Sequence, residues 1–227
     1  MLVILGLDVP CRNMKNLIII GARGYGREVY NWATQCNQYN SEWTIKGFLD
    51  DKKDALDRMN YPVEILSSVE NYEIIQDDVF VCALGGVAFK KKYVSLLIDR
   101  GAEFINLIHP TAIIHDFVNL GTGVIVCPNS LISNECVIGD FVTIQSYSTI
   151  GHDCVVGKWG HLNAYSFMGG YAILEEEVTL HTRATILPGL VVGKGATVGA
   201  GSIVIRKVKP GVTVFGNPAK TIDFGSE

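Results

Sequence analysis

An apolar residue recurs at every sixth position from residue 108 to residue 204, and no insertion breaks the step. The residues at these positions are Ile108, Ile114, Leu120, Val126, Ile132, Ile138, Ile144, Ile150, Val156, Leu162, Met168, Leu174, Leu180, Ile186, Val192, Val198 and Val204. An amphipathic α-helix repeats its apolar positions at a spacing near 3.6 residues and a simple strand at about two, so a step of six fits neither alone. The step is typical of short parallel strands joined by tight corners and coiled into a prism, in which each coil buries its apolar face against its neighbours.

A small side chain precedes most of these apolar residues by two positions, as at Ser130, Cys136 and Ala172. We expect both members of each pair to point into the prism. Glycine follows many of the apolar positions, as at Gly151 and Gly169. We expect these glycines where the chain turns and a side chain would clash.

The segment before the repeat begins with a strand at residues 17–20, a glycine-containing turn at 21–26 and a helical stretch at 27–37. This order is typical of dinucleotide-fold domains, where glycine lets the backbone approach a phosphate and the helix N-terminus offers N–H groups. The glycine spacing is GxxGxG rather than the usual GxGxxG. A tight turn without a ligand is therefore an alternative interpretation.

The rest of this segment predicts strands at 43–49, 79–84 and 104–107 and a helix at 88–100. Strands that alternate with helices favour a parallel sheet. Asp50 and Asp51 follow the second strand, and in parallel sheets the carboxyl ends of the strands form the edge at which ligands bind. The segments predicted to line a ligand crevice there are 21–26, 50–51 and 85–87.

The expected fold class is therefore α/β plus β, a small Rossmann-like domain followed by a parallel β-helix of hexapeptide repeats. The expected units are a dispensable extension at 1–13, a nucleotide-binding domain at 14–106, a β-helix at 107–216 and a C-terminal tail at 217–227.

Composition limits the partners. The net charge of −4 and the lack of a dense basic patch give no reason to expect nucleic acid, and residues 90–92, three lysines, are interpreted as a solvated helix face. No apolar run approaches the roughly 18 residues of a membrane span. Six cysteines without a CxxC or a metal-ligand cluster indicate a reduced, cytoplasmic protein that binds no metal.

Two histidines of the repeat, His152 and His161, occupy outward positions nine residues apart. Three hexads make one circuit of a three-sided coil, so nine residues are half a circuit and place the two histidines on opposite sides of one prism. Two neighbouring chains can bring both into one pocket. Outward apolar residues such as Phe141, Tyr147 and Phe167 suggest a covered flank. We therefore expect a symmetric oligomer, and a three-sided coil suggests a homotrimer.

His152 is followed by Asp153, and a carboxylate in reach of an imidazole fixes its tautomer and makes it a better base. Asp153 as an ordinary corner residue is the alternative. Gly169 and Gly170 fall one coil beyond Gly151 and His152, where a backbone N–H could stabilise an oxyanion.

Several motifs occur together here: residues 150–157 (IGHDCVVG), His161, 168–170 (MGG), 187–189 (LPG), 198–202 (VGAGS) and 216–220 (GNPAK). With the glycine segment 21–26 and FLDD at 48–51 in front, the chain resembles the left-handed β-helix acyltransferases. Within them it is similar to the nucleotide-amino-sugar N-acetyltransferases of bacillosamine and perosamine synthesis, grouped with sialic acid O-acetyltransferases. The resemblance covers almost everything after Met14, and it implies left-handed crossovers, against the usual right-handed rule.

The resemblance implies acetyl transfer from acetyl-CoA to a nucleotide-linked amino sugar, without a metal or a covalent enzyme intermediate. It implies that His152 is the general base and that Asp153 raises its basicity. His161 would contact the thioester end of acetyl-CoA, and the Gly170 N–H would face the thioester oxygen. The coil backbone at Thr182 and Ala200 would line the pantetheine. The residues that would hold the nucleotide are Arg23, Gly24, Tyr25, Asp50 and Asp51.

Three positions depart from the family pattern. Gly85-Gly86-Val87 stands where a Gly-Asp-Asn or Gly-Asn-Asn is frequent, residues 90–92 stand where an arginine often follows, and Gln145 replaces a frequent asparagine. These differences leave the nucleotide and the sugar open.

Other functions stay open as well. One is O-acetylation of a sialic acid-type sugar, since the sequence does not distinguish an amine from a hydroxyl acceptor. A second is a metalloenzyme like the γ-carbonic anhydrases, although the spacing of His152, His161 and His181 does not supply three zinc ligands. A third is a non-catalytic nucleotide-sugar-binding module.

Overall fold

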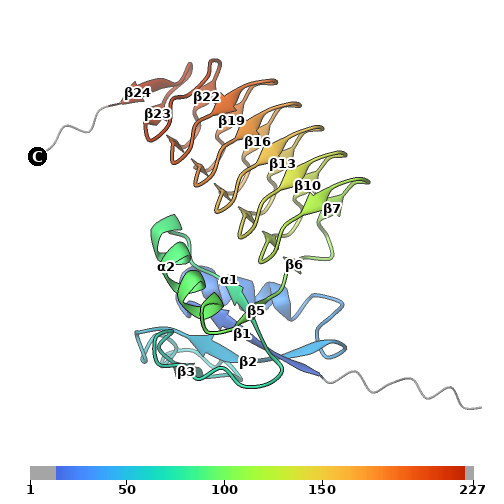
Figure 1. Cartoon of the computed structure of the whole chain (residues 1–227), viewed down its shortest axis with the longest axis vertical. Helices are drawn as coiled ribbons and strands as arrows, with labels where there is room; N and C mark the ends of the chain where they lie inside the picture. Colours follow the sequence, from blue (N-terminus) through green and yellow to red (C-terminus); the bar gives the residue numbers. More distant parts are fainter. Residues whose placement is uncertain (1–13, 223–227) are drawn as a thin grey trace, which may run out of the picture.

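The computed structural model describes residues 14–222. The expected extension at 1–13 and the last five residues of the expected tail lie outside the described residues. The described chain forms an open α/β sheet followed by a three-sided β-helix, which rises from the N-terminal domain as a stack of coils (Figure 1).

The N-terminal domain is a parallel sheet with strand order β3-β2-β1-β4-β5. Its elements are β1 (Lys15–Ile20), α1 (Gly24–Ala33), β2 (Trp43–Leu49), β3 (Ile65–Ser67), β4 (Asp78–Cys82), α2 (Val87–Ile98) and β5 (Glu103–Phe104). Alternate residues of the central strand β1 face opposite helices: Leu17 and Ile19 share a core with α1, and Ile18 and Ile20 share one with α2. Coverage of both faces explains why this strand is a continuous apolar run.

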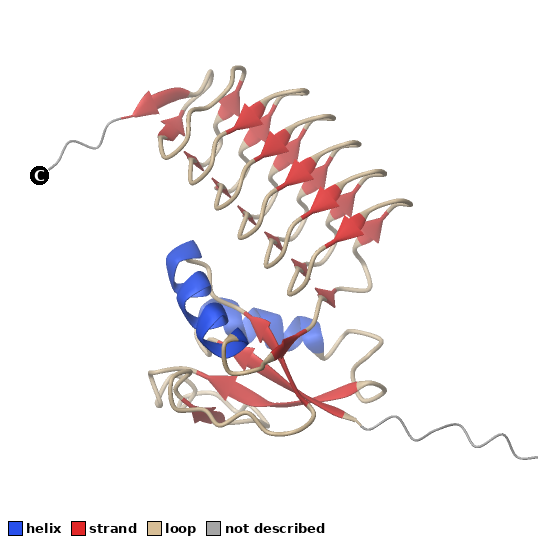
Figure 2. Ribbon diagram, in the orientation of Figure 1, coloured by secondary structure: helices blue, strands red, loops and turns tan. Residues whose placement is uncertain are grey.

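Three parallel sheets form the sides of the β-helix, named here after their first strands (Figure 2). The β6 sheet contains β6 (Leu107–Ile108), β9 (Ile125–Val126), β12 (Thr143–Ile144), β15 (His161–Leu162), β18 (Thr179–Leu180), β21 (Thr197–Val198), β23 (Thr213–Phe215) and β24 (Lys220–Ile222). The β7 sheet contains β7 (Ile113–Ile114), β10 (Leu131–Ile132), β13 (Thr149–Ile150), β16 (Phe167–Met168), β19 (Thr185–Ile186) and β22 (Ile203–Val204). The β8 sheet contains β8 (Asn119–Leu120), β11 (Val137–Ile138), β14 (Val155–Val156), β17 (Ile173–Leu174) and β20 (Val191–Val192).

The predicted inward positions form the core of the prism. The second residue of each short strand is apolar and points inward, and most of these side chains are fully buried, from Ile132 through Val198. The small residues two positions earlier, such as Ser130 and Cys136, are also buried, and their polar atoms bond to backbone carbonyls of the next coil. The hexad pattern therefore specifies both the strands and the interior of the β-helix.

The glycines that follow the apolar positions lie where a side chain would clash, as expected, but they are not the corner residues with positive φ. Most corners turn through one residue with positive φ, and most of these residues are not glycine. One edge of the prism uses Phe117, Glu135, Asp153 and Tyr171, with φ between 56° and 61°. Glycines such as Gly151 have ordinary φ. They are needed because a Cβ on Gly151 would lie 2.8 Å from the Gly170 backbone nitrogen of the next coil. Close approach between coils, rather than a left-handed backbone, explains these glycines.

The N-terminal domain packs on the β6 sheet of the same chain. Ile125 and Cys127 belong to the core that α1 covers, and Phe141 to the core that α2 covers. Phe141, expected to face outward on the prism, is therefore buried under the N-terminal domain, whereas Tyr147 and Phe167 are exposed. Figure 1 shows α2 beside the lower coils.

Most predicted elements are present with shifted ends, and three differences stand out. Strand β3 was not predicted. The strand expected at 104–107 is two strands, β5 and β6, that belong to different sheets. Residues 220–222, expected as tail, form β24, which pairs antiparallel with β23.

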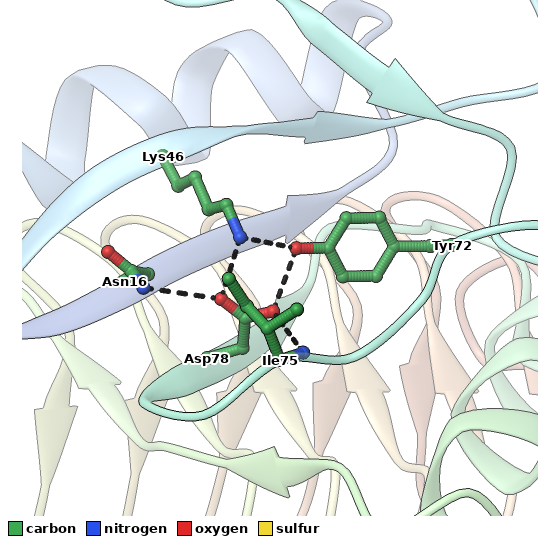
Figure 3. A network of polar contacts seen from close by, with 5 residues as sticks. All are labelled: Asn16, Lys46, Tyr72, Ile75 and Asp78. Atoms are coloured by element: carbon green, nitrogen blue, oxygen red, sulfur yellow. Dashed lines mark hydrogen bonds and ion pairs between the residues drawn. The ribbon is translucent and has the colours of Figure 1, made fainter.

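A buried polar network closes the amino edge of the N-terminal sheet (Figure 3). The Asp78 carboxylate accepts hydrogen bonds from Lys46 Nζ at 2.9 Å, from the Tyr72 hydroxyl at 2.8 Å and from the Ile75 backbone N–H at 3.0 Å. Asn16 is a more distant fourth donor, at 3.4 Å. These donors lower the Asp78 pKa although burial acts against ionisation. The network links β1, β2 and β4 at the edge opposite the predicted crevice.

Candidate active site

A cavity of about 350 Å³ opens in the N-terminal domain where the predicted crevice segments meet. Its lining includes Gly21, Arg23, Tyr25, Gly26, Asp50, Asp51, Gly85, Gly86, Phe89 and Tyr93. The structure therefore brings together the three segments that the sequence singled out, and it adds two aromatic side chains from α2. Gly24, the first residue of α1, does not line the cavity.

The glycine spacing has a steric reason. Gly21 has a φ of +99°, which only glycine adopts readily, and a Cβ on Gly26 would lie 1.9 Å from the Gly21 carbonyl oxygen. Glycine at both positions lets the first turn of α1 fold over the end of β1. The N-terminus of α1 has no side-chain cap and no acidic residue in its first turn, so its backbone N–H groups suit an anion such as a phosphate.

Two carboxylates stand beside this turn. Asp50 is buried, accepts hydrogen bonds from the backbone N–H groups of Ala22 and Lys52, both at 2.9 Å, and lies 3.5 Å from the exposed Arg23 guanidinium. Asp51 is exposed and accepts a hydrogen bond from the Tyr93 hydroxyl at 3.0 Å. Asp50 therefore holds the glycine turn in shape, while Asp51 and Arg23 keep polar groups available to a ligand.

A histidine–aspartate pair occupies one corner of the β-helix. His152 Nδ1 lies 2.7 Å from Asp153 Oδ2, and the edge of the imidazole packs against the Tyr171 ring at a centroid distance of 5.0 Å. Asp153 accepts the Nδ1–H, which leaves the Nε2 lone pair free. About half of the His152 side chain is exposed. A half-exposed imidazole held by a carboxylate is chemically able to act as a general base.

Gly170 lies directly over this imidazole. A Cβ at this position would be 2.6 Å from His152 Nε2, so any larger residue would displace the ring. The next coil thus approaches His152 with backbone alone.

Thr182 and Ala200 lie at a different corner from His152. They stack one coil apart, with the Gly201 N–H donating to the Thr182 carbonyl at 2.9 Å, between the β6 and β7 sheets. His152 and Gly170 lie between the β7 and β8 sheets. One chain therefore does not bring all predicted donor-site residues together.

His161 is buried rather than solvent-facing. It lies on β15 under the N-terminal domain, with a ring-centroid distance of 6.3 Å to Tyr25 and a distance of 3.2 Å from its Nε2 to Gln145 Nε2. Burial, assisted by the nearby Lys90 ammonium, lowers the His161 pKa to about 3, so the ring is neutral at physiological pH. Among the described residues, its Nδ1 atom has no hydrogen-bond partner.

Lys90 corrects the interpretation of residues 90–92 as a solvated face. Its side chain is 1% exposed and its Nζ donates to the Phe141 carbonyl at 3.1 Å and to Thr143 Oγ1 at 2.8 Å, both on the β-helix. The available signal was helical spacing, because Lys90 stands four and seven residues before the buried Val94 and Leu97.

Further features of the described residues concern metal-ligand clusters, membrane-spanning helices and free cysteines. Between residues 14 and 222 there is no cluster of three or more histidine, cysteine or carboxylate side chains that could hold a metal ion. In the same range no helix is long and apolar enough to cross a membrane. The five cysteines of this range are buried free thiols.

Comparisons with known proteins agree with this architecture. Residues 16–97 match the model of the PglD N-terminal domain. Over 92% of the chain, the structure superimposes on the acetyltransferase domain of PglB from Neisseria gonorrhoeae, with a TM-score of 0.84, 26% identity and all of that chain covered. It also superimposes on PerB from Caulobacter crescentus, solved in complex with CoA and GDP-perosamine, with a TM-score of 0.82, 27% identity and 97% of that chain covered.

Curated relatives match a shorter segment. The 2,3,4,5-tetrahydropyridine-2,6-dicarboxylate N-acetyltransferase of Clostridium perfringens is 48% identical over 50 residues, 22% of this chain and 21% of that protein. Its Staphylococcus aureus counterpart is 49% identical over 55 residues, 24% of this chain and 23% of that protein. The matches thus span about a fifth of these relatives' length. The chain thus combines a segment that matches the PglD N-terminal domain with three-sided coils, and over 92% of its length it is similar in structure to the PglB acetyltransferase domain and to PerB.

Proposed function

We propose that this protein is an acetyl-CoA-dependent N-acetyltransferase that acts on a nucleotide-linked amino sugar. The observation that carries the proposal is the corner in which His152 bonds to Asp153 through Nδ1 and presents Nε2 to Gly170. The cavity in the N-terminal domain supplies a separate binding place of suitable character, with a helix N-terminus, Arg23 and two carboxylates around it. PerB, a structural neighbour, was solved with CoA and GDP-perosamine.

The corner offers the groups that direct transfer needs. The amine nitrogen of the sugar attacks the thioester carbonyl, and His152 Nε2 accepts the proton that the nitrogen loses. Asp153 stabilises the imidazolium through Nδ1. The Gly170 N–H donates to the developing oxyanion. The C–S bond then breaks, and His152 returns its proton to the departing thiolate, giving the N-acetyl sugar and free CoA.

The acceptor is placed by the N-terminal domain. In this proposal the phosphates of the nucleotide bind at the N-terminus of α1, which begins at Gly24, and Arg23 and Tyr25 contribute side chains to the cavity wall. Asp50 and Asp51 face the sugar-phosphate side. No residue of the His152 corner lines the cavity in the described chain. We therefore propose a homotrimer in which His152 and Gly170 of one chain complete the site of the next.

The donor lies between chains in this arrangement. Thr182 and Ala200 line the pantetheine with exposed coil backbone, and His161 contacts the thioester end. The Nδ1 atom of His161, which has no partner among residues 14–222, supports a ligand contact there. The buried free thiols of the described chain fit a reducing, cytoplasmic location.

The test combines ligand screening with turnover. UDP-, GDP-, dTDP- and CMP-linked amino sugars are added with and without acetyl-CoA, and melting temperature and CoA release are recorded. A ligand that binds the folded state raises the melting temperature by mass action. We expect one nucleotide class to raise it and to release CoA with acetyl-CoA present.

The matched variant is His152→Ala. It should retain the melting-temperature rise with acetyl-CoA and lose transfer by about 10²–10⁴-fold, the usual contribution of a general base. A chain that transfers acetyl only to hydroxyl groups of sugars lacking an amine would overturn the N-acetyltransferase assignment in favour of O-acetylation. Unchanged transfer by His152→Ala would remove His152 from the mechanism.

A further inference from the structure

Lys90 connects the nucleotide-binding domain to the β-helix through a buried ammonium. Its Nζ donates to the Phe141 carbonyl and to Thr143 Oγ1, at 3.1 Å and 2.8 Å, and both acceptors are themselves buried. Within residues 14–222 the structure shows no salt bridge to Lys90. The charge is therefore held by one backbone carbonyl and one hydroxyl alone.

The two ends of this connection reach the two halves of the site. Lys90 lies one turn into α2, whose N-cap Gly86 and first-turn residue Phe89 line the cavity. On the other side, Thr143 pairs in register with His161 on the neighbouring strand. Lys90 thus joins the helix that bounds the nucleotide cavity to the strand next to the histidine assigned to the acetyl end.

Stability alone does not account for a lysine here. Removing an ammonium from water costs several kcal/mol, and well-packed apolar residues often replace buried charged groups with no loss of stability. Burial lowers the Lys90 pKa only to about 8, so the side chain is mostly charged at neutral pH. The neighbouring Val94 and Leu97 show that the same face of α2 accepts apolar side chains.

We propose that Lys90 is a positioning residue for acetyl transfer. By fixing α2 to Phe141 and Thr143, it sets the orientation of the nucleotide cavity relative to the β-helix and so the distance between the acceptor amine and the acetyl donor. The inference rests on the proposed function. It assigns a specific role to a side chain that touches neither substrate.

The chain provides a matched control in the next residue. Lys91 also crosses from α2 to the β-helix, where its Nζ pairs with Glu177 Oε1 at 2.7 Å, but its side chain is 40% exposed. Lys90→Met therefore removes two cross-domain hydrogen bonds and Lys91→Met one ion pair, and each variant removes one positive charge. They differ in whether the contact is buried and directional.

The experiment measures kcat, KM, the Kd of nucleoside diphosphate and of CoA by calorimetry, and the melting temperature. The nucleotide used in the titration is UDP, GDP, dTDP or CMP, according to which nucleotide-linked amino sugar binds in the ligand screen. We expect Lys90→Met to lower kcat by about 10²-fold, the cost of misplacing reacting groups by about 1 Å, with both Kd values within twofold. Lys91→Met should stay within twofold in kcat. Lys90→Arg, which keeps a donor cation, should recover part of the loss.

A second variant covers the case in which Lys90→Met does not fold. Thr143→Val removes the hydroxyl that accepts the Lys90 hydrogen bond, with little change in side-chain shape. It should also lower kcat, by a smaller factor than Lys90→Met does. Where the double variant can be made, its loss should be smaller than the product of the two single losses, because both changes break one contact.

The outcomes separate this inference from the proposed function. A wild-type chain that transfers acetyl, with kcat equal in Lys90→Met and Lys91→Met, overturns the role of Lys90 and leaves the function in place. Parallel losses of melting temperature, nucleotide affinity and kcat show a purely structural lysine and overturn it as well. A wild-type chain that acetylates no nucleotide amino sugar overturns both.

Discussion

Gly170 lies against the imidazole of His152, one coil away, so closely that a Cβ on Gly170 would be 2.6 Å from His152 Nε2. The contact joins the candidate base to the candidate oxyanion donor and requires glycine for steric reasons. The position of the His152 imidazole therefore depends on the spacing between the two coils.

Gly170→Ala should abolish most activity without unfolding the β-helix. The added methyl group displaces the His152 ring from the position in which Asp153 holds it, and we expect kcat to fall by about 10²-fold or more. Steady-state kinetics and circular dichroism check this. The matched control is Gly189→Asn, at the same corner and one coil beyond Tyr171. The φ of Gly189 is +69°, and a Cβ on this residue would meet nothing within 4 Å. An active Gly170→Ala chain would contradict the geometry.

Asp153→Asn should lower kcat while acetyl-CoA binding is retained. The carboxylate that accepts the His152 Nδ1–H at 2.7 Å is replaced by an amide, which stabilises the imidazolium less well. We expect a loss of roughly 10-fold to 10²-fold, smaller than that of His152→Ala. Kinetics with calorimetric CoA binding measure it. Equal activity in Asp153→Asn and wild type would make Asp153 an ordinary corner residue.

Asp50→Asn should weaken nucleotide binding. The buried carboxylate accepts the N–H groups of Ala22 and Lys52, and an amide can satisfy only one of them with its oxygen facing the turn. The glycine turn then loses its fixed shape, and we expect nucleotide affinity to fall by about tenfold, or roughly 1.4 kcal/mol. Asp54→Asn, an exposed acid in the following loop, serves as the control in the same calorimetric titration.

The lowered pKa of His161 predicts that the folded protein loses stability in mild acid. Burial lowers its pKa to about 3 in the folded chain, whereas an unfolded histidine has a pKa near 6.5. Between these values the unfolded state binds more protons, so folding stability falls as pH is lowered from about 6.5 towards 3. The slope from one such group approaches about 1.4 kcal/mol per pH unit.

Urea denaturation at pH 7 and pH 5 tests this slope. Between pH 7 and pH 5, the free energy of unfolding should fall by roughly 2 kcal/mol more in the wild type than in His161→Gln, which keeps a polar side chain but does not titrate. Parallel losses in the two proteins would show that the histidine is protonated in the folded state as readily as in the unfolded chain.

Asp78→Asn should destabilise the N-terminal domain. The change leaves Lys46 Nζ without its carboxylate and breaks up the network with Tyr72 and Ile75 at the amino edge of the sheet (Figure 3). Loss of one partner of a buried ion pair costs about 3 kcal/mol or more, reduced here because Lys46 is partly exposed. We expect about 2 kcal/mol by thermal or urea unfolding.

The pH dependence follows from the lowered Asp78 pKa. Because the folded carboxyl holds its proton less tightly than the unfolded one, this contribution is present at neutral pH and is lost as pH falls through the acidic range below the ordinary Asp pKa. Lys92→Met, which removes an exposed pair with Glu70 and a contact of the ammonium with the Tyr93 ring, should leave the unfolding midpoint nearly unchanged.

Much of this molecule follows from local sequence. The hexad step predicts the β-helix because side-chain direction alternates with a short period, so the inward apolar position and the inward small position are set within each coil. The cavity segments are predictable for a related reason: in a parallel sheet, residues that follow the strands share one edge, which places Gly21, Asp50 and Gly85 together whatever their separation along the chain. The pairing of His152 with Asp153 needs only two adjacent residues at a corner.

What covers an outward face is decided only when the domains dock. His161 points outward from the prism and in sequence resembles a solvated residue, but the N-terminal domain packs on the β6 sheet and buries it. Helical spacing places Lys90 on the same face of α2 as Val94 and Leu97, whereas its hydrogen-bond acceptors on the β-helix are set only by the docking of the domains. The reason for glycine at 151 and 170 likewise lies in a neighbouring coil, about one circuit away along the chain. Short-range periodicity encodes direction towards or away from a core, whereas burial of the outward side depends on contacts between residues far apart in sequence, which no local pattern records.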